Sequence, residues 1–436
     1  MDVPTRCDVV VIGGGPGGST AATLLSQRGY DVVLLEKAKH PRYNVGESLI
    51  PHFWKYCELT GVDEQVEADG FISKAGGTVV WNDVIRQMRF RDFGYARPAL
   101  HVERDRFDKI LLDYARAQGA SVFEEVAVTG ATLADAGESS VSYRRLGSGE
   151  SGQVACRFVV DASGQGAVLA RQLGIRVIDE GFRFMSIWGY FENSWYVAAD
   201  GQAHPFSKLR DVPPTTFVSN IDRWGWLWHI PLRESTSIGF VLPQEDLKAI
   251  KGSDEALEEY FVRRCGELPY LGRLLEEAEY VDGSFHVIRD YSYRPSRSTG
   301  PGFFLIGDAA AFTDPIFSIG VVLAMYSAYL ATWAIEHSFR NPARTHVYQA
   351  MFANQFETRL EASRSLALPR YGYGGPEGDL VKQSISFETS LEQELMYVVS
   401  TLTTRSQNYV EMSEDSSGPP ITSDKYRVLE EIEWAA

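Results

Sequence analysis

The sequence predicts an α/β fold in which a Rossmann-like domain is interleaved with an antiparallel-sheet domain and followed by a short C-terminal helical region. Three observations predict it. A continuous apolar strand, Cys7–Ile12, runs into a glycine-rich turn and a helix. Two more short apolar strands, at 158–161 and 302–306, end in glycine-containing turns much later in the chain. Between them, residues 175–285 alternate apolar and polar side chains and are rich in aromatics, as in an antiparallel sheet.

Composition limits the classes of function that need to be considered. A chain of 436 residues suits two or three closely joined domains. The net charge of −16 and the absence of a basic tract argue against a nucleic-acid partner. The four cysteines lack C-x-x-C spacing, so neither a disulfide framework nor a thiolate metal site is indicated. Without a signal peptide or an apolar run of about 18 residues, we expect a cytoplasmic protein with no membrane partner.

The glycine-rich turn lies between two apolar strands. Gly13, Gly15 and Gly18 form G-x-G-x-x-G, a helix follows, and the strand at 30–35 ends in Glu36. The glycines permit a tight turn and the close approach of a pyrophosphate to the helix N-terminus, and Glu36 lies at the right distance to hold a ribose hydroxyl. Because strand, helix, strand and acid are all present, the motif predicts a dinucleotide site.

Two later segments resemble flavoproteins of the p-hydroxybenzoate hydroxylase type and imply that the dinucleotide is FAD. The strand at 302–306 ends in Gly307-Asp308, where an Asp of that family reaches the ribityl chain; a helix N-cap is the other reading of Asp308. Arg104, in the segment at 102–112, would touch the cofactor by the same resemblance. Taken alone, Arg104 would be read as a surface salt bridge.

The order of these segments predicts a discontinuous flavin domain. We expect it to comprise residues 1–70, 100–170 and 285–360, with 71–99 and 171–284 forming a substrate-side β-sheet domain. Residues 361–436 are expected to form a C-terminal helical cap.

A tryptophan-rich strand is the most informative single stretch of the chain. Trp224, Trp226 and Trp228 occupy alternate positions, so a strand would point all three indoles to one face. Pro231 has no N–H and should end the strand or place it at an edge. The indoles could pack a core or form the wall of a cavity, and the pattern alone leaves both readings open.

Lys74 lies in a glycine-bounded apolar context, Gly70–Thr78. Desolvation there would lower the pKa of the amine and favour its neutral, nucleophilic form. A solvated loop lysine is the alternative.

Residues 314–321 lead into a long apolar helix. The N–H groups and dipole at its N-terminus can stabilise charge on a reduced flavin and hold a small anion. A simple flavin contact without an anion is the alternative.

Together these motifs resemble the flavin-dependent halogenases. The match rests on W-x-W-x-I-P at 226–231, Lys74 in K-x-G-G, and D-P-I-F-S-I-G at 314–320, with G-E-S-L-I-P at 46–51 in agreement. It covers approximately residues 5–360 and is most specific for the branch that acts on phenols, pyrroles and carrier-tethered aromatics.

The resemblance implies FAD, reduced by a separate flavin reductase, together with O2 and chloride or bromide. Halide would lie near Ser318, Ile319 and Gly320, and hypohalous acid would travel through the interior to Lys74. Trp226 and Trp228 would keep the aromatic substrate, free or linked to a carrier protein, away from the flavin. The implied cofactor contacts are Gly13, Gly15, Gly18, Glu36, Lys37, Arg42, Ser48, Arg104, Asp308 and Val321.

The chain departs from the halogenase pattern at two positions. Tryptophan halogenases carry a Glu where this chain has Phe317, which favours an electron-rich ring that needs less help from a base. Ile319 replaces a Ser or Thr, so only backbone N–H groups could bind halide there. Two other hypotheses stay open: an FAD monooxygenase or flavin dehydrogenase that uses NAD(P)H directly, and a flavin-binding protein that has lost its chemistry.

Overall fold

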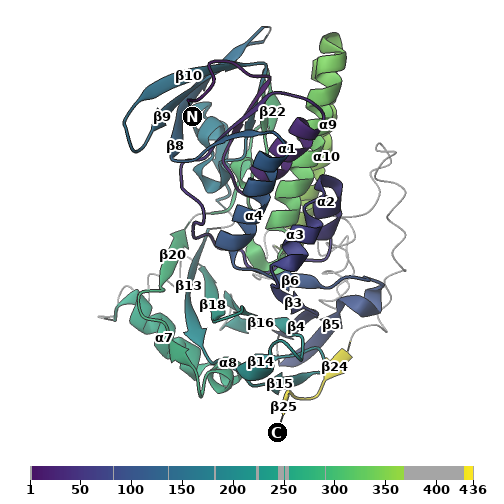
Figure 1. The fold of residues 1–436 in the computed structure, drawn as a ribbon. Helices are drawn as coiled ribbons and strands as arrows, with labels where there is room; N and C mark the ends of the chain where they lie inside the picture. The colour runs from purple at the N-terminus through teal and green to yellow at the C-terminus, as the bar shows by residue number, and fades with distance from the viewer. Residues whose placement is uncertain are drawn as a thin grey trace.

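The computed structural model describes residues 2–81, 83–135, 137–180, 183–221, 225–243, 250, 255–289, 291–367 and 427–435. Two sheets organise it. One is covered by the long helices in the upper part of Figure 1, and the other fills the lower part. The segments that build each sheet alternate along the chain, as the interleaved α/β prediction requires.

The first sheet has six strands and carries the glycine-rich turn. In spatial order its strands are β22 (Thr299–Gly300), β23 (Phe303–Leu305), β11 (Phe158–Asp161), β1 (Val9–Ile12), β2 (Val32–Leu35) and β7 (Ser121–Phe123). All neighbours pair in parallel except β22 and β23. Strands β1, β2 and β11 are buried throughout, which explains their continuous apolar sequences.

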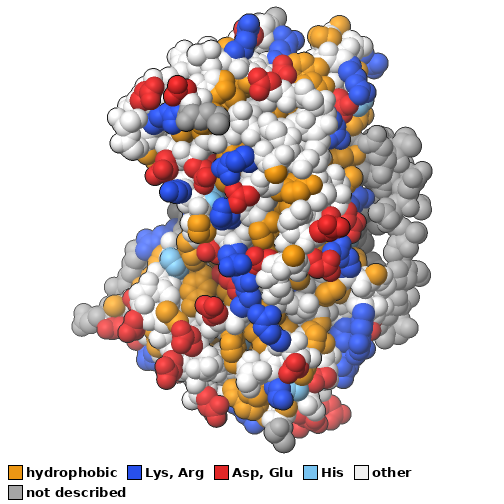
Figure 2. All heavy atoms as spheres, in the orientation of Figure 1, with side chains coloured by type: hydrophobic (Ala, Val, Ile, Leu, Met, Phe, Trp, Pro, Cys, Tyr) orange, Lys and Arg blue, Asp and Glu red, His pale blue; other side chains and the backbone are white. Residues whose placement is uncertain are grey.

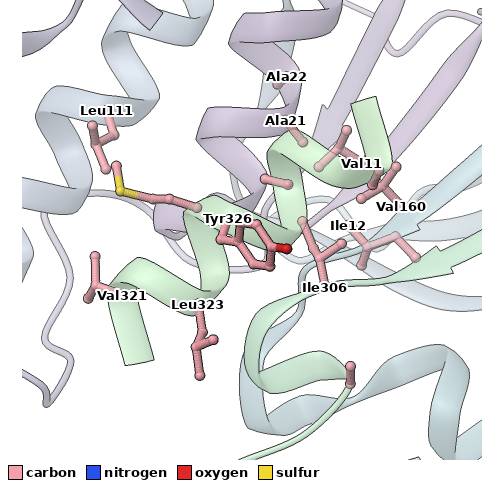
Figure 3. Close-up of a cluster of buried hydrophobic side chains, with 14 of the residues drawn as sticks. Val11, Ile12, Ala21, Ala22, Leu111, Val160, Ile306, Val321, Leu323 and Tyr326 are labelled. Atoms are coloured by element: carbon pink, nitrogen blue, oxygen red, sulfur yellow. The ribbon is translucent and has the colours of Figure 1, made fainter. Parts of the chain in front are cut away.

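Helices pack on this sheet and on one another. They are α1 (Pro16–Gln27), α2 (Phe53–Thr60), α3 (Asp63–Ala68), α4 (Arg104–Ala117), α5 (Val168–Gln172), α9 (Gly320–Arg340) and α10 (Thr345–Ala367). Helix α9 packs against α1, α2 and α10. Figure 3 shows the result: Tyr326 and Leu323 of α9 lie in one buried cluster with Ala21 of α1 and Val11 of β1.

The second sheet has nine strands and contains the tryptophan strand near its middle. Along its main path the strands are β19 (Glu279–Tyr280), β13 (Phe184–Glu192), β18 (Thr236–Pro243), β17 (Gly225–Pro231), β16 (Thr215–Ile221), β4 (Gly76–Trp81), β5 (Val84–Arg89) and β24 (Arg427–Leu429), with β20 (His286–Arg289) paired to β13. Strand β17 ends at Pro231, as predicted.

The second sheet is antiparallel, as predicted, except at one place. Strands β4 and β16 pair in parallel, with Gly77 opposite Thr216. The two strands belong to separate insertions joined through the first domain, so no hairpin constrains their relative direction. One face of this sheet packs on α7 (Leu257–Glu267) and α8 (Pro269–Leu274), through Phe261 and Leu271 among others.

The remaining strands form small sheets of two or three strands. They are the sheet β8 (Val126–Thr132), β9 (Ser139–Arg145) and β10 (Ser151–Cys156), the pair β12 (Arg176–Ile178) and β21 (Tyr293–Pro295), the pair β3 (Ile72–Lys74) and β6 (Ala99–His101), and the sheet β14 (Tyr196–Val197), β15 (Gln202–His204) and β25 (Glu433–Trp434).

The helical cap predicted for 361–436 is wrong at its end. Residues 361–367 do belong to α10, and 368–426 lie outside the described residues. Residues 427–434, however, form β24 and β25, which extend two existing sheets at β5 and β15. An open sheet edge supplies backbone partners to any extended segment that reaches it, so tertiary pairing decides the conformation of such a short stretch.

The surface charges, the cysteines and the helices can be followed in the described part of the chain. Charges of both signs are interspersed over the face shown in Figure 2. Cys7, Cys57, Cys156 and Cys265 are all buried and unpaired. Within the described part of the chain, no helix is both long and apolar enough to cross a membrane.

Gly18 allows the close contact between α1 and the glycine-rich turn. A Cβ at this position would lie 1.9 Å from the carbonyl oxygen of Gly13. We therefore expect Gly18→Ala to lower the free energy of unfolding by about 1–3 kcal/mol, measured by urea denaturation. Gly266→Ala in α7 is the control, because its Cβ would meet no atom within 4 Å. Equal stability of the two variants would contradict this role for Gly18.

Candidate functional site

A single cavity of about 520 Å³ runs between the two sheets. At one end it is lined by the glycine-rich turn and Glu36, and at the other by tryptophans of the second sheet. Of the predicted site residues, those that line it are Gly13, Gly15, Glu36, Lys37, Arg42, Ser48, Arg104, Trp226, Trp228, Asp308, Ser318, Ile319, Gly320 and Val321. The fold therefore brings together residues that lie more than 300 positions apart in the sequence.

The turn after β1 is shaped to receive a bulky group. Gly13 has a φ of +99°, and a Cβ there would lie 2.5 Å from the carbonyl oxygen of Ala162. Gly15 is the N-cap of α1, and the first amides of a helix have no partner within it. The turn thus leaves a concave backbone surface with free donors, which suits a pyrophosphate.

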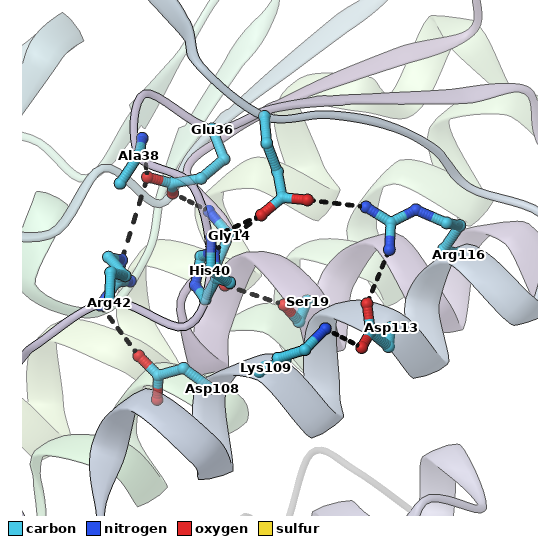
Figure 4. A network of polar contacts seen from close by, with 11 residues as sticks. Gly14, Ser19, Glu36, Ala38, His40, Arg42, Asp108, Lys109, Asp113 and Arg116 are labelled. Carbon is cyan, nitrogen blue, oxygen red and sulfur yellow. Dashed lines mark hydrogen bonds and ion pairs between the residues drawn. The ribbon is translucent and has the colours of Figure 1, made fainter.

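Glu36 is held in place by backbone amides, as Figure 4 shows. Its Oε2 accepts a hydrogen bond from the N–H of Gly14 at 2.6 Å, and its Oε1 accepts one from Ala38 at 2.8 Å. Arg42 bridges the carboxylates of Glu36, at 3.9 Å, and Asp108, at 3.2 Å. The carboxylate is therefore oriented before any ribose hydroxyl arrives. Lys37, by contrast, is exposed at the mouth of the cavity.

Arg104 and Asp308 line the middle of the cavity. The guanidinium of Arg104 is buried and pairs with Asp108, with Nε 2.8 Å from Oδ1, and it also donates to the carbonyl of Val45 at 2.7 Å. Burial raises the pKa of Asp308 to about 6, and no side chain of the described residues donates a hydrogen bond to its carboxylate. Asp308 is half-buried and lines the cavity, so its carboxylate is open to the hydroxyls of a polyhydroxyl chain. With the glycine cradle, these residues fit FAD.

The N-terminus of α9 forms the floor of the cavity beside Asp308. Asp314 caps the preceding turn by accepting a hydrogen bond from the N–H of Ile316 at 3.0 Å. Ser318 adopts a left-handed backbone with φ of +55°, which bends the chain into α9. Ile319, Gly320 and Val321 begin that helix and line the cavity, so their amides are available to an anion.

The far wall of the cavity is made of tryptophans. Trp226 and Trp228 lie on one face of β17 with ring centroids 5.9 Å apart, and Trp188 of β13 is 6.4 Å from Trp228. Gly239 of β18 lies opposite both strands, and a Cβ there would be 2.1 Å from the Trp228 ring. The indoles therefore line a cavity, which decides between the two readings of the strand. Trp224 lies outside the described residues.

Lys74 is buried behind the lining of the cavity. Its Nζ donates to the hydroxyl of Ser48 at 2.8 Å and to the carbonyl of Leu49 at 2.9 Å, and it lies 5.6 Å from the centre of the Phe90 ring. Desolvation lowers the pKa of Lys74 to about 7, in the expected direction. Ser48 and Thr216 line the cavity, and Lys74 lies behind Ser48.

One predicted cofactor contact, Gly18, does not line the cavity but supports the turn.

Sequence reasoning missed several residues of the site. Glu47, which was not assigned a role, lines the cavity and accepts a hydrogen bond from the hydroxyl of Tyr190 at 2.5 Å. Burial raises the pKa of Glu47 to about 7. The only sequence signal for Trp188 was that it occurs in an aromatic-rich strand. The only signal for Glu47 was that it precedes Ser48 in the G-E-S-L-I-P segment.

Comparisons with known proteins point to one family. The model of the FAD binding domain family matches residues 6–351. A tryptophan 2-halogenase of Chondromyces crocatus is 34% identical over 362 residues, covering 82% of this chain and 67% of that protein. This chain thus spans about two thirds of the length of such curated relatives.

Among the solved structures that this chain resembles are a halogenase and a flavoprotein/dehydrogenase. The myxobacterial chondrochloren halogenase matches with a TM-score of 0.75 and 31% identity, covering 84% of this chain and 83% of that one. A flavoprotein/dehydrogenase from Cytophaga hutchinsonii matches with a TM-score of 0.74 and 26% identity, covering 91% and 92%.

The buried amine of Lys74 predicts a pH-dependent stability. Its pKa is 10.5 in the unfolded chain and about 7 in the folded one, so between these values the unfolded state binds an extra proton and stability rises with pH. Lys74→Met removes the cost of burying the amine. We therefore expect its free energy of unfolding to exceed that of the wild type by the largest amount at pH 7, and this excess to shrink as the pH approaches 10.5. Urea denaturation across this range measures it. A difference that does not vary with pH would contradict a buried amine.

Proposed function

This chain belongs to the flavin-dependent halogenases, within the FAD binding domain family, and from that premise we propose that it halogenates an electron-rich aromatic ring of phenol or pyrrole type. The halide is chloride or bromide, and a separate flavin reductase supplies reduced FAD. The substrate is a free small molecule or one tethered to a carrier protein, in the biosynthesis of a natural product.

One observation carries the proposal. The cavity holds the dinucleotide-binding residues at one end and the tryptophans at the other, and Lys74, a buried lysine, lies behind the hydroxyl of Ser48 in the lining. Ser48 thus stands between the cavity in which an oxidant would form and the amine that would use it. A hydroxylase of the same fold needs its substrate against the flavin and has no use for such a separation.

Residues at the two ends of the cavity have different roles. When bound and reduced, FAD activates O2 so that halide is oxidised to hypohalous acid. The amides at the start of α9, at Ile319 and Gly320, hold the halide, because a helix N-terminus favours an anion. Trp226 and Trp228 exclude the organic substrate from this compartment while a molecule as small as hypohalous acid passes.

Lys74 directs the oxidant to the substrate. With a pKa of about 7, the amine is present both protonated and neutral at neutral pH. The protonated form donates a hydrogen bond to hypohalous acid. The neutral form attacks the halogen, so that an N–halogen bond forms, the O–halogen bond breaks, and water leaves with the amine proton. The halogen then bonds to the ring carbon, which loses its proton as the amine is regenerated.

The type of ring follows from Phe317. At the position where tryptophan halogenases carry a Glu, Phe317 is buried and offers no base. A ring activated by its own oxygen or nitrogen loses its proton readily after attack. The relatives include a tryptophan 2-halogenase, a chondrochloren halogenase and a sulochrin halogenase, which do not select one ring, so Phe317 carries this part of the proposal.

Direct use of NAD(P)H is the second candidate, and the likeness to a flavoprotein/dehydrogenase favours it. We expect no bleaching of bound FAD when the purified holoprotein is mixed with NADPH or NADH under anaerobic conditions. Bleaching should follow only when a flavin reductase is added, as seen by absorbance. Rapid bleaching without the reductase would favour a monooxygenase or dehydrogenase instead.

Replacing the lysine tests the proposed chemistry. In reactions with FAD, a reductase, O2 and halide, we expect Lys74→Ala to reduce halogenated product at least about 100-fold, because the amine that delivers the halogen is gone. Flavin reoxidation should continue. Mass spectrometry of a panel of phenols and pyrroles, free and carrier-linked, measures the product. Lys109→Ala, at a half-exposed lysine of α4, is the matched control.

Halogenated product from Lys74→Ala at the rate of Lys109→Ala would refute the role of the lysine. Absence of any halogenated product from the wild-type protein across the whole panel would refute the proposed function.

A further inference from the structure

A chain of hydrogen bonds leads away from Lys74 through three other buried side chains. Lys74 Nζ is 2.8 Å from Ser48 Oγ, which is 2.9 Å from Thr216 Oγ1. Thr216 Oγ1 is 2.9 Å from His101 Nε2, and His101 Nδ1 is 3.0 Å from the carbonyl oxygen of Pro231. These residues are all buried, and they come from the 46–51 loop and from β3, β6, β16 and β17.

The carbonyl of Pro231 sets the direction of this chain. A carbonyl oxygen only accepts, so His101 Nδ1 carries the proton and donates it. Burial and the nearby Lys74 lower the pKa of His101 well below 6.5, so the ring is neutral and Nε2 is an acceptor. The Thr216 hydroxyl therefore donates to His101, and the Ser48 hydroxyl donates to Thr216.

The direction matters most at Ser48. Its one proton is committed to Thr216, so its oxygen accepts from Lys74 and also from the hydroxyl of Ser318, at 3.1 Å. Ser48 consequently has no proton to offer to the nitrogen of Lys74. The amine donates two hydrogen bonds, to Ser48 and to Leu49. Its third proton when charged, or its lone pair when neutral, is not used by either of these bonds.

Proton transfer along the same chain is the competing interpretation. It would move a proton from Lys74 through Ser48 and Thr216 to His101. A fully buried imidazole whose pKa is lowered by a neighbouring ammonium is a poor sink for that proton. This series of hydrogen bonds is therefore suited to fixing the orientation of the hydroxyl protons and not to accepting a proton from Lys74.

We propose that Thr216 and His101 are positioning residues whose hydrogen bonds keep the proton of Ser48 turned away from Lys74, so that the lone pair of the lysine stays free to attack a small electrophile. The inference deepens the proposed function, since it explains how the lysine stays reactive beside the hydroxyl of Ser48. It also links Lys74 to Ser318, because both residues share one acceptor, the oxygen of Ser48.

The test measures the amine directly and needs no halogenation. Cyanate, whose reactive form is the small neutral acid HNCO, carbamylates neutral amines, and peptide mass spectrometry resolves each lysine. In the holoprotein, we expect Thr216→Val to slow carbamylation of Lys74 about fivefold, the factor equivalent to ~1 kcal/mol for one net hydrogen bond onto its lone pair. Without the Thr216 acceptor, the Ser48 hydroxyl can turn to the lysine nitrogen 2.8 Å away.

Three companion variants separate positioning from packing. Thr216→Ser keeps the hydroxyl and should restore the wild-type rate. His101→Leu removes the acceptor for Thr216 and should slow labelling as Thr216→Val does. Thr215→Val removes a buried hydroxyl from the same strand, one that bonds to Thr78 and Val197 and not to this chain, and should leave the rate unchanged. Lys109 serves as the internal standard for labelling in every variant.

The outcomes are distinct. Equal rates for Thr216→Val and Thr215→Val would overturn the proposal, and so would slow labelling of Thr216→Ser. A Lys74 that resists cyanate in the wild type, while Lys109 reacts, would overturn it as well, because the lone pair would then be masked already. The labelling result stands whether or not the wild type halogenates any compound of the panel, so the two proposals fail separately.

Discussion

Burial of the Lys74 amine is the constraint around which the rest of the site is organised. An ammonium loses its hydration when buried, and the cost appears as the fall of its pKa from 10.5 to about 7. The amine is tolerated because Ser48 and Leu49 accept its protons. Those two acceptors come from one loop, so that loop has to be held firmly against the strand that carries the lysine.

The fold meets this requirement through backbone pairing. The N–H of Val102 donates to the carbonyl of Glu47 at 2.8 Å, and the N–H of Leu49 donates to the carbonyl of Leu100 at 3.0 Å. The loop is thereby fastened to β6, the same strand that pairs with β3 and Lys74. Lys74, Ser48 and His101 are consequently placed by a single patch of extended backbone. A loop tied down in this way suits chemistry that depends on the direction of one hydroxyl proton.

Local sequence patterns were sufficient to predict features that depend on residues close together in the sequence. The Gly13–Gly18 turn needs a backbone that only glycine adopts easily, and the strand, helix and Glu36 follow within one supersecondary unit. The alternation of Trp226 and Trp228 likewise fixes a shared face for any strand. The parallel pairing of β4 with β16 and the strands at 427–434 could not be predicted, because their partners come from distant segments.

The amino-acid sequence by itself therefore determined the α/β class and the dinucleotide motif, since both rest on short-range backbone geometry and residue chemistry, whereas Lys74 was singled out by the resemblance of its motif to the halogenases. Only the tertiary structure decided that Trp188 completes the tryptophan wall, that Gly239 makes room for it, and that Thr216 and His101 stand behind Ser48. The hydrogen bonds of Thr216 with Ser48 and His101 join positions more than 100 residues apart. Their physical basis is the packing of two sheets and the bonding of buried donors, which no local pattern records.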